Sequence, residues 1–277
     1  MRSRHHSWLC IVILLGAAPL ASAAWSQRLE LRDYLEEYVF PEQLVSFQLT
    51  FPPGTGTRHL RLREEGQGRD LPYQLTEVGA AHARLHFRAG LKLGERRVFT
   101  VTSDAGYAPR FAAGVKLRDA DPRRRTVVID AGTQQVEVPH GEYAPGTRLS
   151  DVLPPLVRVG REAGRWAAQG RFTGDVRVER VRGEVLEEGP LRVRYRVEYR
   201  LQGGGRYEVV LTAQAGERYV TVEETLAGIR HADGLGFELS YREGVAPDAR
   251  IAMANNGAYL ERSGKYGAGV KEGKLPY

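Results

Sequence analysis

The stretch that decides the fold is Leu-Arg-Val-Arg-Tyr-Arg-Val-Glu-Tyr-Arg-Leu, residues 191–201, followed by Gln-Gly-Gly-Gly-Arg-Tyr-Glu-Val-Val-Leu-Thr-Ala, residues 202–213. Apolar and charged residues alternate along the first segment, and a period of two is typical of a strand with one buried and one solvated face. The glycine run predicts a turn, so the two segments are expected to form an antiparallel hairpin. A second turn at residues 215–217 predicts a third strand over residues 219–226.

The predicted meander extends in both directions along the chain. We expect it to continue upstream over residues 176–186 and downstream over residues 237–241. Helical periodicity is nearly absent, since only residues 29–38 fit a short helix, which Phe40 and Pro41 would end. Toward the amino terminus, further short strands are predicted over residues 45–51, 60–64, 71–78, 83–89 and 97–102. These patterns predict a mostly β protein with antiparallel sheets.

A change in composition divides the chain. Residues 103–125 are rich in Gly, Ala, Pro and charge, and they end in the basic run Arg123-Arg124-Arg125. We place a boundary near residue 110, with an amino-terminal β-sandwich over residues 24–110 and a second β-sandwich over residues 111–277. The last residues carry no strong strand pattern, as in a frayed end or a sandwich that continues.

The first 23 residues have the features of a secretory signal. Two arginines precede the apolar run 8–20, and Ala21-Ser22-Ala23 fits a cleavage site. The run is too short to span a bilayer, which needs about 20 apolar residues, although an uncleaved signal would anchor the chain. We expect a periplasmic or secreted protein without a stable membrane span after cleavage. The only cysteine, Cys10, lies in this leader, so the rest has no disulfide, thiolate metal site or cysteine nucleophile.

The charge balance limits the partners. Forty Lys and Arg against 34 Asp and Glu give a net charge of +6. Arginines interleave with acids along the predicted strands, which fits biased codon usage or, alternatively, binding of acidic polymers through arginine forks. Export makes nucleic acid an unsuitable partner. No Gly-x-Ser-x-Gly, Walker A or Rossmann glycine pattern is present, so we expect no nucleotide or other cofactor.

Two parts of the chain resemble known carbohydrate-active families. Leu-Arg-Leu-Arg-Glu-Glu-Gly at residues 60–66, with residues 70–75 and 93–101, resembles the small β-sandwich that accompanies sugar-processing domains in bacterial glycoside hydrolases and polysaccharide lyases. Glu-Gly-Pro-Leu-Arg-Val-Arg-Tyr-Arg-Val-Glu-Tyr at residues 188–199, with residues 205–224, is similar to the supersandwich of the galactose-mutarotase-like superfamily. The resemblance implies carbohydrate as ligand or substrate, with catalytic residues in another domain. The His/Glu pair of mutarotases matches no defined positions here.

The group of residues best suited to acid–base catalysis is His140, Tyr143 and Arg148. A His or Tyr can act as a general base and a Tyr as an acid, while an Arg neutralises a uronate carboxylate, so these three are the candidate catalytic residues of a lyase. The alternative is a surface turn with polar residues. They lie in residues 139–173, which we expect to be a long irregular loop.

The same region supplies a candidate sugar-binding group. Trp166 can offer an aromatic face to the C–H face of a pyranose, and Arg165 and Arg171 stand close to it in the sequence. These three are the candidate substrate-binding residues. The alternative is that the tryptophan belongs to the core.

Other titratable residues have simpler explanations. His82 and His86 are four apart in a predicted strand, which separates them by about 13 Å, so we expect no metal site. The pair Asp119 and Asp121 lacks the spacing of an EF-hand loop and is expected to form a turn. Three glutamates invite a glycosidase hypothesis, although neighbours along a strand point to opposite faces; they are Glu223, Glu224 and Glu238.

We therefore expect an exported carbohydrate-active β protein that binds or helps process a polysaccharide or oligosaccharide, as the non-catalytic or leading part of a glycoside hydrolase or polysaccharide lyase. The alternative is a structural or adhesion module of the bacterial envelope without glycan chemistry. The oligomeric state is left open.

Overall fold

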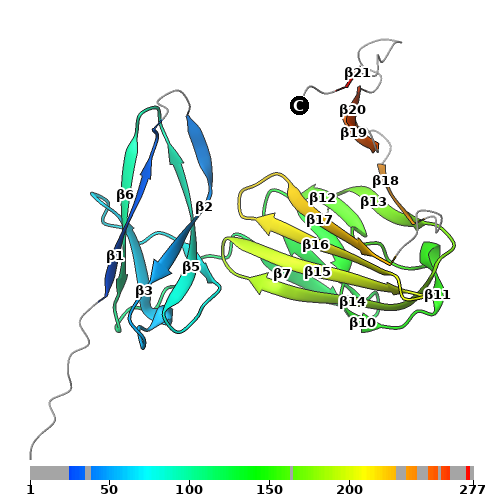
Figure 1. The fold of residues 1–277 in the computed structure, drawn as a ribbon, viewed down its shortest axis with the longest axis horizontal. Helices are drawn as coiled ribbons and strands as arrows, with labels where there is room; N and C mark the ends of the chain where they lie inside the picture. Colours follow the sequence, from blue (N-terminus) through cyan, green and yellow to red (C-terminus); the bar gives the residue numbers. More distant parts are fainter. Residues whose placement is uncertain are drawn as a thin grey trace, which may run out of the picture.

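The computed structural model describes residues 25–34, 39–162, 165–228, 235–241, 249–254, 257–262 and 273–274. Antiparallel strands dominate this part of the chain, as predicted, and its helical elements are two 3-10 turns, η1 (Thr57–His59) and η2 (Leu149–Asp151). The strands form two units (Figure 1). The predicted leader lies outside the described residues.

The amino-terminal unit consists of two three-stranded sheets, ordered β1-β6-β3 and β2-β5-β4. Their inner residues form one core, in which the rings of Phe87 and Phe99 lie 4.7 Å apart. The strands are β1 (Ser26–Arg32), β2 (Phe40–Thr50), β3 (Leu60–Glu64), β4 (Tyr73–Thr76), β5 (His82–Leu91) and β6 (Arg96–Ser103).

The predicted meander is confirmed in the second unit. It comprises β14 (Arg177–Glu188), β15 (Arg192–Leu201), β16 (Arg206–Gln214) and β17 (Val220–Ala227), paired in that order. Alternate residues of β15 are buried, including Tyr195 and Tyr199, and the residues between them carry charge on the other face. Two short strands, β10 (Gly141–Tyr143) and β11 (Thr147–Arg148), pair with β14.

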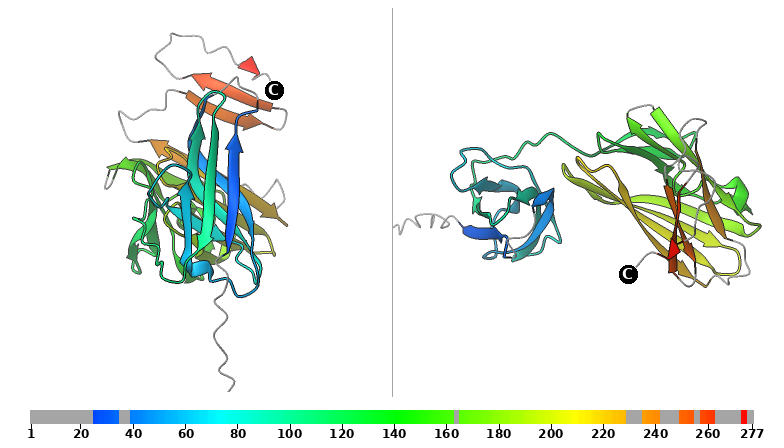
Figure 2. Two further views of the ribbon diagram at one scale, coloured as in Figure 1. Left: turned by 90° about the vertical axis from the view of Figure 1, so that its left-hand side faces the viewer. Right: turned by 90° about the horizontal axis from the view of Figure 1, so that it is seen from above.

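A six-stranded sheet forms the second layer of this unit (Figure 2, right). Its strand order is β18-β13-β12-β9-β8-β7. Its strands are β7 (Lys116–Asp121), β8 (Thr126–Asp130), β9 (Gln135–Pro139), β12 (Arg158–Glu162), β13 (Arg165–Thr173) and β18 (Gly236–Tyr241). The layers share a core of their own, in which Phe172 packs edge-on against Tyr199 at 5.0 Å.

The predicted helix over residues 29–38 is wrong in its described part. Leu29 and Arg32 belong to β1, which pairs with β6 and buries Leu29 to 4% exposure. Phe40 and Pro41 begin β2 and end no helix. Long-range pairing here outweighs the weak local preference for a helix.

Two further expectations are corrected. Residues 237–241 do not extend the meander, because β18 pairs with β13 in the other layer, where Phe237 contacts Phe172. Residues 139–173 are not one irregular loop, since β10, β11, η2, β12 and β13 lie within them. Alternation was hidden there by short strands and by the bulged pairing of β12 with β13.

Toward the carboxyl end, β19 (Ala249–Ala254), β20 (Gly257–Arg262) and β21 (Gly273–Lys274) form a further small sheet of three strands. In the residues that the structure describes, no helix has the length and apolar character needed to cross a membrane.

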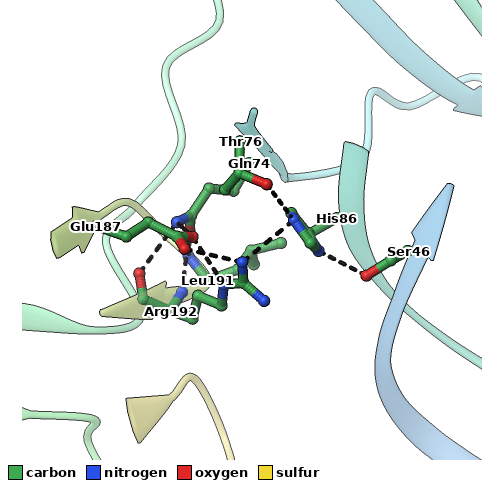
Figure 3. A network of polar contacts seen from close by, with 7 residues as sticks. All are labelled: Ser46, Gln74, Thr76, His86, Glu187, Leu191 and Arg192. Carbon is green, nitrogen blue, oxygen red and sulfur yellow. Dashed lines mark hydrogen bonds and ion pairs between the residues drawn. The ribbon is translucent and has the colours of Figure 1, made fainter. Parts of the chain in front are cut away.

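Gln74 joins the two units (Figure 3). This residue of β4 is 5% exposed, and its side-chain oxygen accepts the backbone N–H groups of Leu191 at 3.1 Å and Arg192 at 3.0 Å. Its amide nitrogen donates to the Arg192 carbonyl at 3.2 Å and to the carboxylate of Glu187. One amide side chain thus binds the tip of the β14–β15 hairpin at the junction.

Replacing Gln74 should separate the unfolding of the two units. In Gln74→Leu, the backbone N–H groups of Leu191 and Arg192 lose their acceptor, which we expect to weaken the junction by about 2–4 kcal/mol. Differential scanning calorimetry should then show an earlier, broader or divided transition. Gln67→Leu is the matched control, since Gln67 is exposed and bonds only Glu64 nearby. Equal melting of both variants would contradict the role of Gln74.

Candidate functional site

Trp166 lies on the outer face of the six-stranded sheet, away from the core. Along β13, Ala168 and Phe172 are buried against the core. Val159 pairs with Ala168, but the next residue of β12, Gly160, pairs with Trp166, so Ala167 is an extra residue. This bulge reverses the alternation and turns the partly buried indole outward.

A buried carboxylate anchors the groups around this indole. Glu137 is 2% exposed and accepts a hydrogen bond from Thr126 Oγ1 at 2.8 Å and another from Arg158 Nε. The Arg158 guanidinium carbon lies 4.3 Å from the centre of the Trp166 ring system. We call these four residues the outer cluster. The ion pair fixes the guanidinium, and the guanidinium holds the indole by a cation–π contact.

A second arginine lies on the same face. Arg118 Nε donates to Asp130 at 2.8 Å, and its terminal nitrogen donates to Gln135 at 2.7 Å. Gln135 is 1% exposed. Polar side chains are therefore packed closely enough on this face to be held in fixed positions, as a binding surface requires.

The other two predicted binding residues lie on the same strand as the tryptophan. Arg165 is exposed beside Trp166 at the start of β13. Arg171 is exposed on the outer face and donates two hydrogen bonds to Glu238 of β18, at 2.9 and 2.6 Å. The structure thus places all three on β13, the strand next to the edge strand β18, with Arg171 occupied by an ion pair.

The three predicted catalytic residues are not brought together. His140 Nδ1 contacts Tyr195 at 2.9 Å, and the Tyr195 hydroxyl donates to the Pro139 carbonyl, so His140 is the donor. The Tyr143 hydroxyl is buried, and burial raises the pKa of this group to about 12. Arg148 lies in β11, which pairs with a different part of β14 than Tyr143 does, and it forms an ion pair with exposed Asp175 at 3.5 Å. The guanidinium that covers Tyr143, at 4.6 Å, belongs to Arg125 instead.

The carboxylates considered from the sequence form no catalytic pair in the described residues. Glu223 and Glu224 are consecutive in β17 and so lie on opposite faces; Glu224 accepts from Tyr207 at 2.8 Å. Glu238 belongs to the other layer and binds Arg171. The separation of these carboxylates argues against glycosidase chemistry through them.

The described residues include no group of three metal-ligating side chains. His82 and His86 do lie in one strand, β5, as expected. Asp121 accepts the backbone N–H groups of Arg123 and Arg124 at 2.9 and 3.1 Å and so stabilises a turn, whereas Asp119, expected in the same turn, lies within strand β7.

Sequence reasoning missed a Ser–His contact at the junction. Ser46 Oγ lies 2.6 Å from Nδ1 of His86, whose Nε2 contacts Thr76 Oγ1 at 2.7 Å and Arg192 at 3.3 Å (Figure 3). An arginine only donates, so Nε2 accepts and the proton lies on Nδ1. His86 therefore donates to Ser46 and does not activate it as a nucleophile. Only the packing of the two units brings Arg192 here, so no sequence spacing could have revealed it.

Comparison with protein-family models gave no match, and no curated protein matches the chain significantly.

Acid should weaken the fold through His86. Burial, and next the Arg192 charge, lower the pKa of His86 to about 4, against about 6.5 in an unfolded chain. Between these values only the unfolded state takes up the proton, so stability is full above pH 6.5 and falls toward pH 4, by about 2–3 kcal/mol. Urea unfolding at several pH values measures this. His86→Gln should flatten the dependence in this window, whereas exposed His82→Gln should not; equal profiles would contradict it.

Removing the charge of Glu137 should loosen the outer cluster. In Glu137→Gln, Arg158 loses its anionic partner, and we expect a loss of about 2–3 kcal/mol in the free energy of unfolding. Trp166 emission should shift as the guanidinium moves. Glu142→Gln is the control, because Glu142 is half exposed and lies 3.3 Å from exposed Arg180. A loss of stability without any change in Trp166 emission would show that Glu137 does not hold the indole in position.

Proposed function

We propose that the protein is an exported carbohydrate-binding β protein whose glycan surface is the outer cluster. The observation that carries this proposal is the outward turn of Trp166 at the Ala167 bulge, with Arg158 held against its ring. An indole presents apolar area to the C–H face of a sugar, and a fixed guanidinium donates to hydroxyl or carboxylate oxygens. Bulges are frequent where a sheet re-aims a functional side chain.

The geometry also indicates how a sugar would be oriented. Arg158 contacts the ring system of Trp166, so the sugar is expected on the part of the indole that Arg158 leaves uncovered. Nε of Arg158 is bound to Glu137, which leaves its terminal nitrogens for the sugar.

The separated acid–base groups favour binding over catalysis. The Tyr143 hydroxyl is buried and has a raised pKa, His140 is bonded to Tyr195, and Arg148 lies elsewhere. In this proposal the two units correspond to an amino-terminal β-sandwich and a mutarotase-like supersandwich. Hydrolase or lyase chemistry would then belong to another domain, as the family resemblance implies.

Loss of the Trp166 side chain should remove most glycan affinity. We expect Trp166→Ala to bind at least about tenfold more weakly, since stacking and the cation–π contact both disappear. A glycan array identifies the ligand, and affinity electrophoresis measures the change. The control is Tyr219→Ala, because Tyr219 is a 57% exposed aromatic residue outside the cluster.

Two results would count against this function. Equal losses in both variants would place binding away from the outer cluster. Absence of binding to any glycan by the unaltered protein would favour the alternative, a structural or adhesion module.

A further inference from the structure

The turn between β7 and β8 carries three consecutive exposed arginines, Arg123, Arg124 and Arg125. Their side chains make no ion pair within the part of the chain that the structure describes, in contrast to Arg118 and Arg158 on the adjoining face. Three guanidinium groups without an ion pair in one turn repel each other and attract an anion. This turn is therefore a concentrated positive charge.

The turn is held in one conformation by its own contacts. Asp121 accepts the N–H groups of Arg123 and Arg124, and Arg125 adopts a left-handed backbone with φ 55°. The Arg125 carbonyl accepts the His140 N–H at 2.8 Å, and its guanidinium covers Tyr143. A non-glycine residue in this region is uncommon, and such strain often accompanies functional sites.

The arginine turn is continuous with the outer cluster. Thr126 follows Arg125 directly and donates to Glu137, which binds Arg158. Thr126 pairs with Pro139 at one end of β9, and Gln135 pairs with Gly160 beside Trp166 at the other. Four residues of strand separate these ends by about 13 Å. A short oligosaccharide along β9 would reach both.

We propose that the arginine turn binds an acidic group of the glycan and makes the protein selective for anionic polysaccharides. This inference rests on the proposed function, because Trp166 supplies the sugar-stacking end. Arginine forks pair with carboxylate or sulfate oxygens in bidentate geometry. The nearby acids do not cancel the turn, since Asp121 brings one negative charge against three guanidinium groups and Glu142 pairs with Arg180.

The test compares polymers with the same backbone and different charge. Arg123→Gln with Arg124→Gln should weaken binding to polygalacturonate or dextran sulfate about tenfold at low salt, and leave binding to methyl-esterified polygalacturonate or dextran unchanged. Affinity electrophoresis in each polymer measures both. The matched control is Arg58→Gln with Arg69→Gln, which removes two exposed charges from the amino-terminal unit. Circular dichroism checks folding.

The outcomes separate this inference from the function on which it rests. If Trp166→Ala loses glycan affinity and the turn variant shows no selective loss for acidic polymers, the proposed glycan binding stands and the proposed role of the arginine turn is wrong. Equal losses in the turn and control variants would reduce the effect to net charge and overturn it too. Turn-dependent binding to phosphatidylglycerol vesicles, with no binding to the acidic polymers, would identify the ligand as a lipid surface. The proposal that the turn binds an anionic glycan would then be wrong.

Discussion

The buried tyrosines of the meander are the constraint on which the second unit depends. A buried hydroxyl needs a partner, and Tyr195 and Tyr199 donate to the carbonyls of Pro139 and Leu153. Burial raises the pKa of Tyr199 and keeps it a donor. These two bonds tie the segment between β9 and β12 to the meander. Gly183 completes the arrangement, because a Cβ there would collide with the Pro139 carbonyl.

A strand can be predicted from the sequence only where apolar and polar residues alternate along it without interruption. The meander was predicted because β15 and β16 alternate without interruption for many residues. The helix near Leu29 was wrong because pairing with β6 outweighed a weak local pattern. The face of Trp166 could not be predicted, since one extra residue, Ala167, reverses the alternation, and a bulge leaves no composition signal that distinguishes it from regular strand.

The candidate sites were also only partly predictable from the sequence. His140 and Tyr143 could be selected from the sequence because of their residue types. The arginine beside them is Arg125 and not Arg148, because the β7–β8 turn and β10 become neighbours only in the folded structure. Glu137 carried no signal, since its importance comes from burial beside Arg158. Contacts between strands far apart in the sequence decide which titratable groups become neighbours, and a single sequence does not contain them.

The distribution of arginine partners also bears on the basic character of the chain. On the outer face of the meander, arginines and glutamates alternate across strands, as where Arg196 pairs with Glu184 and Arg206 lies 2.8 Å from Glu198. Such pairs neutralise one another and leave little field at a distance. The field at a distance therefore comes mainly from arginines that outnumber the acids around them. The β7–β8 turn concentrates three of these, so the field there is local and directed beside the outer cluster, and it is not a uniform coat that serves solubility alone.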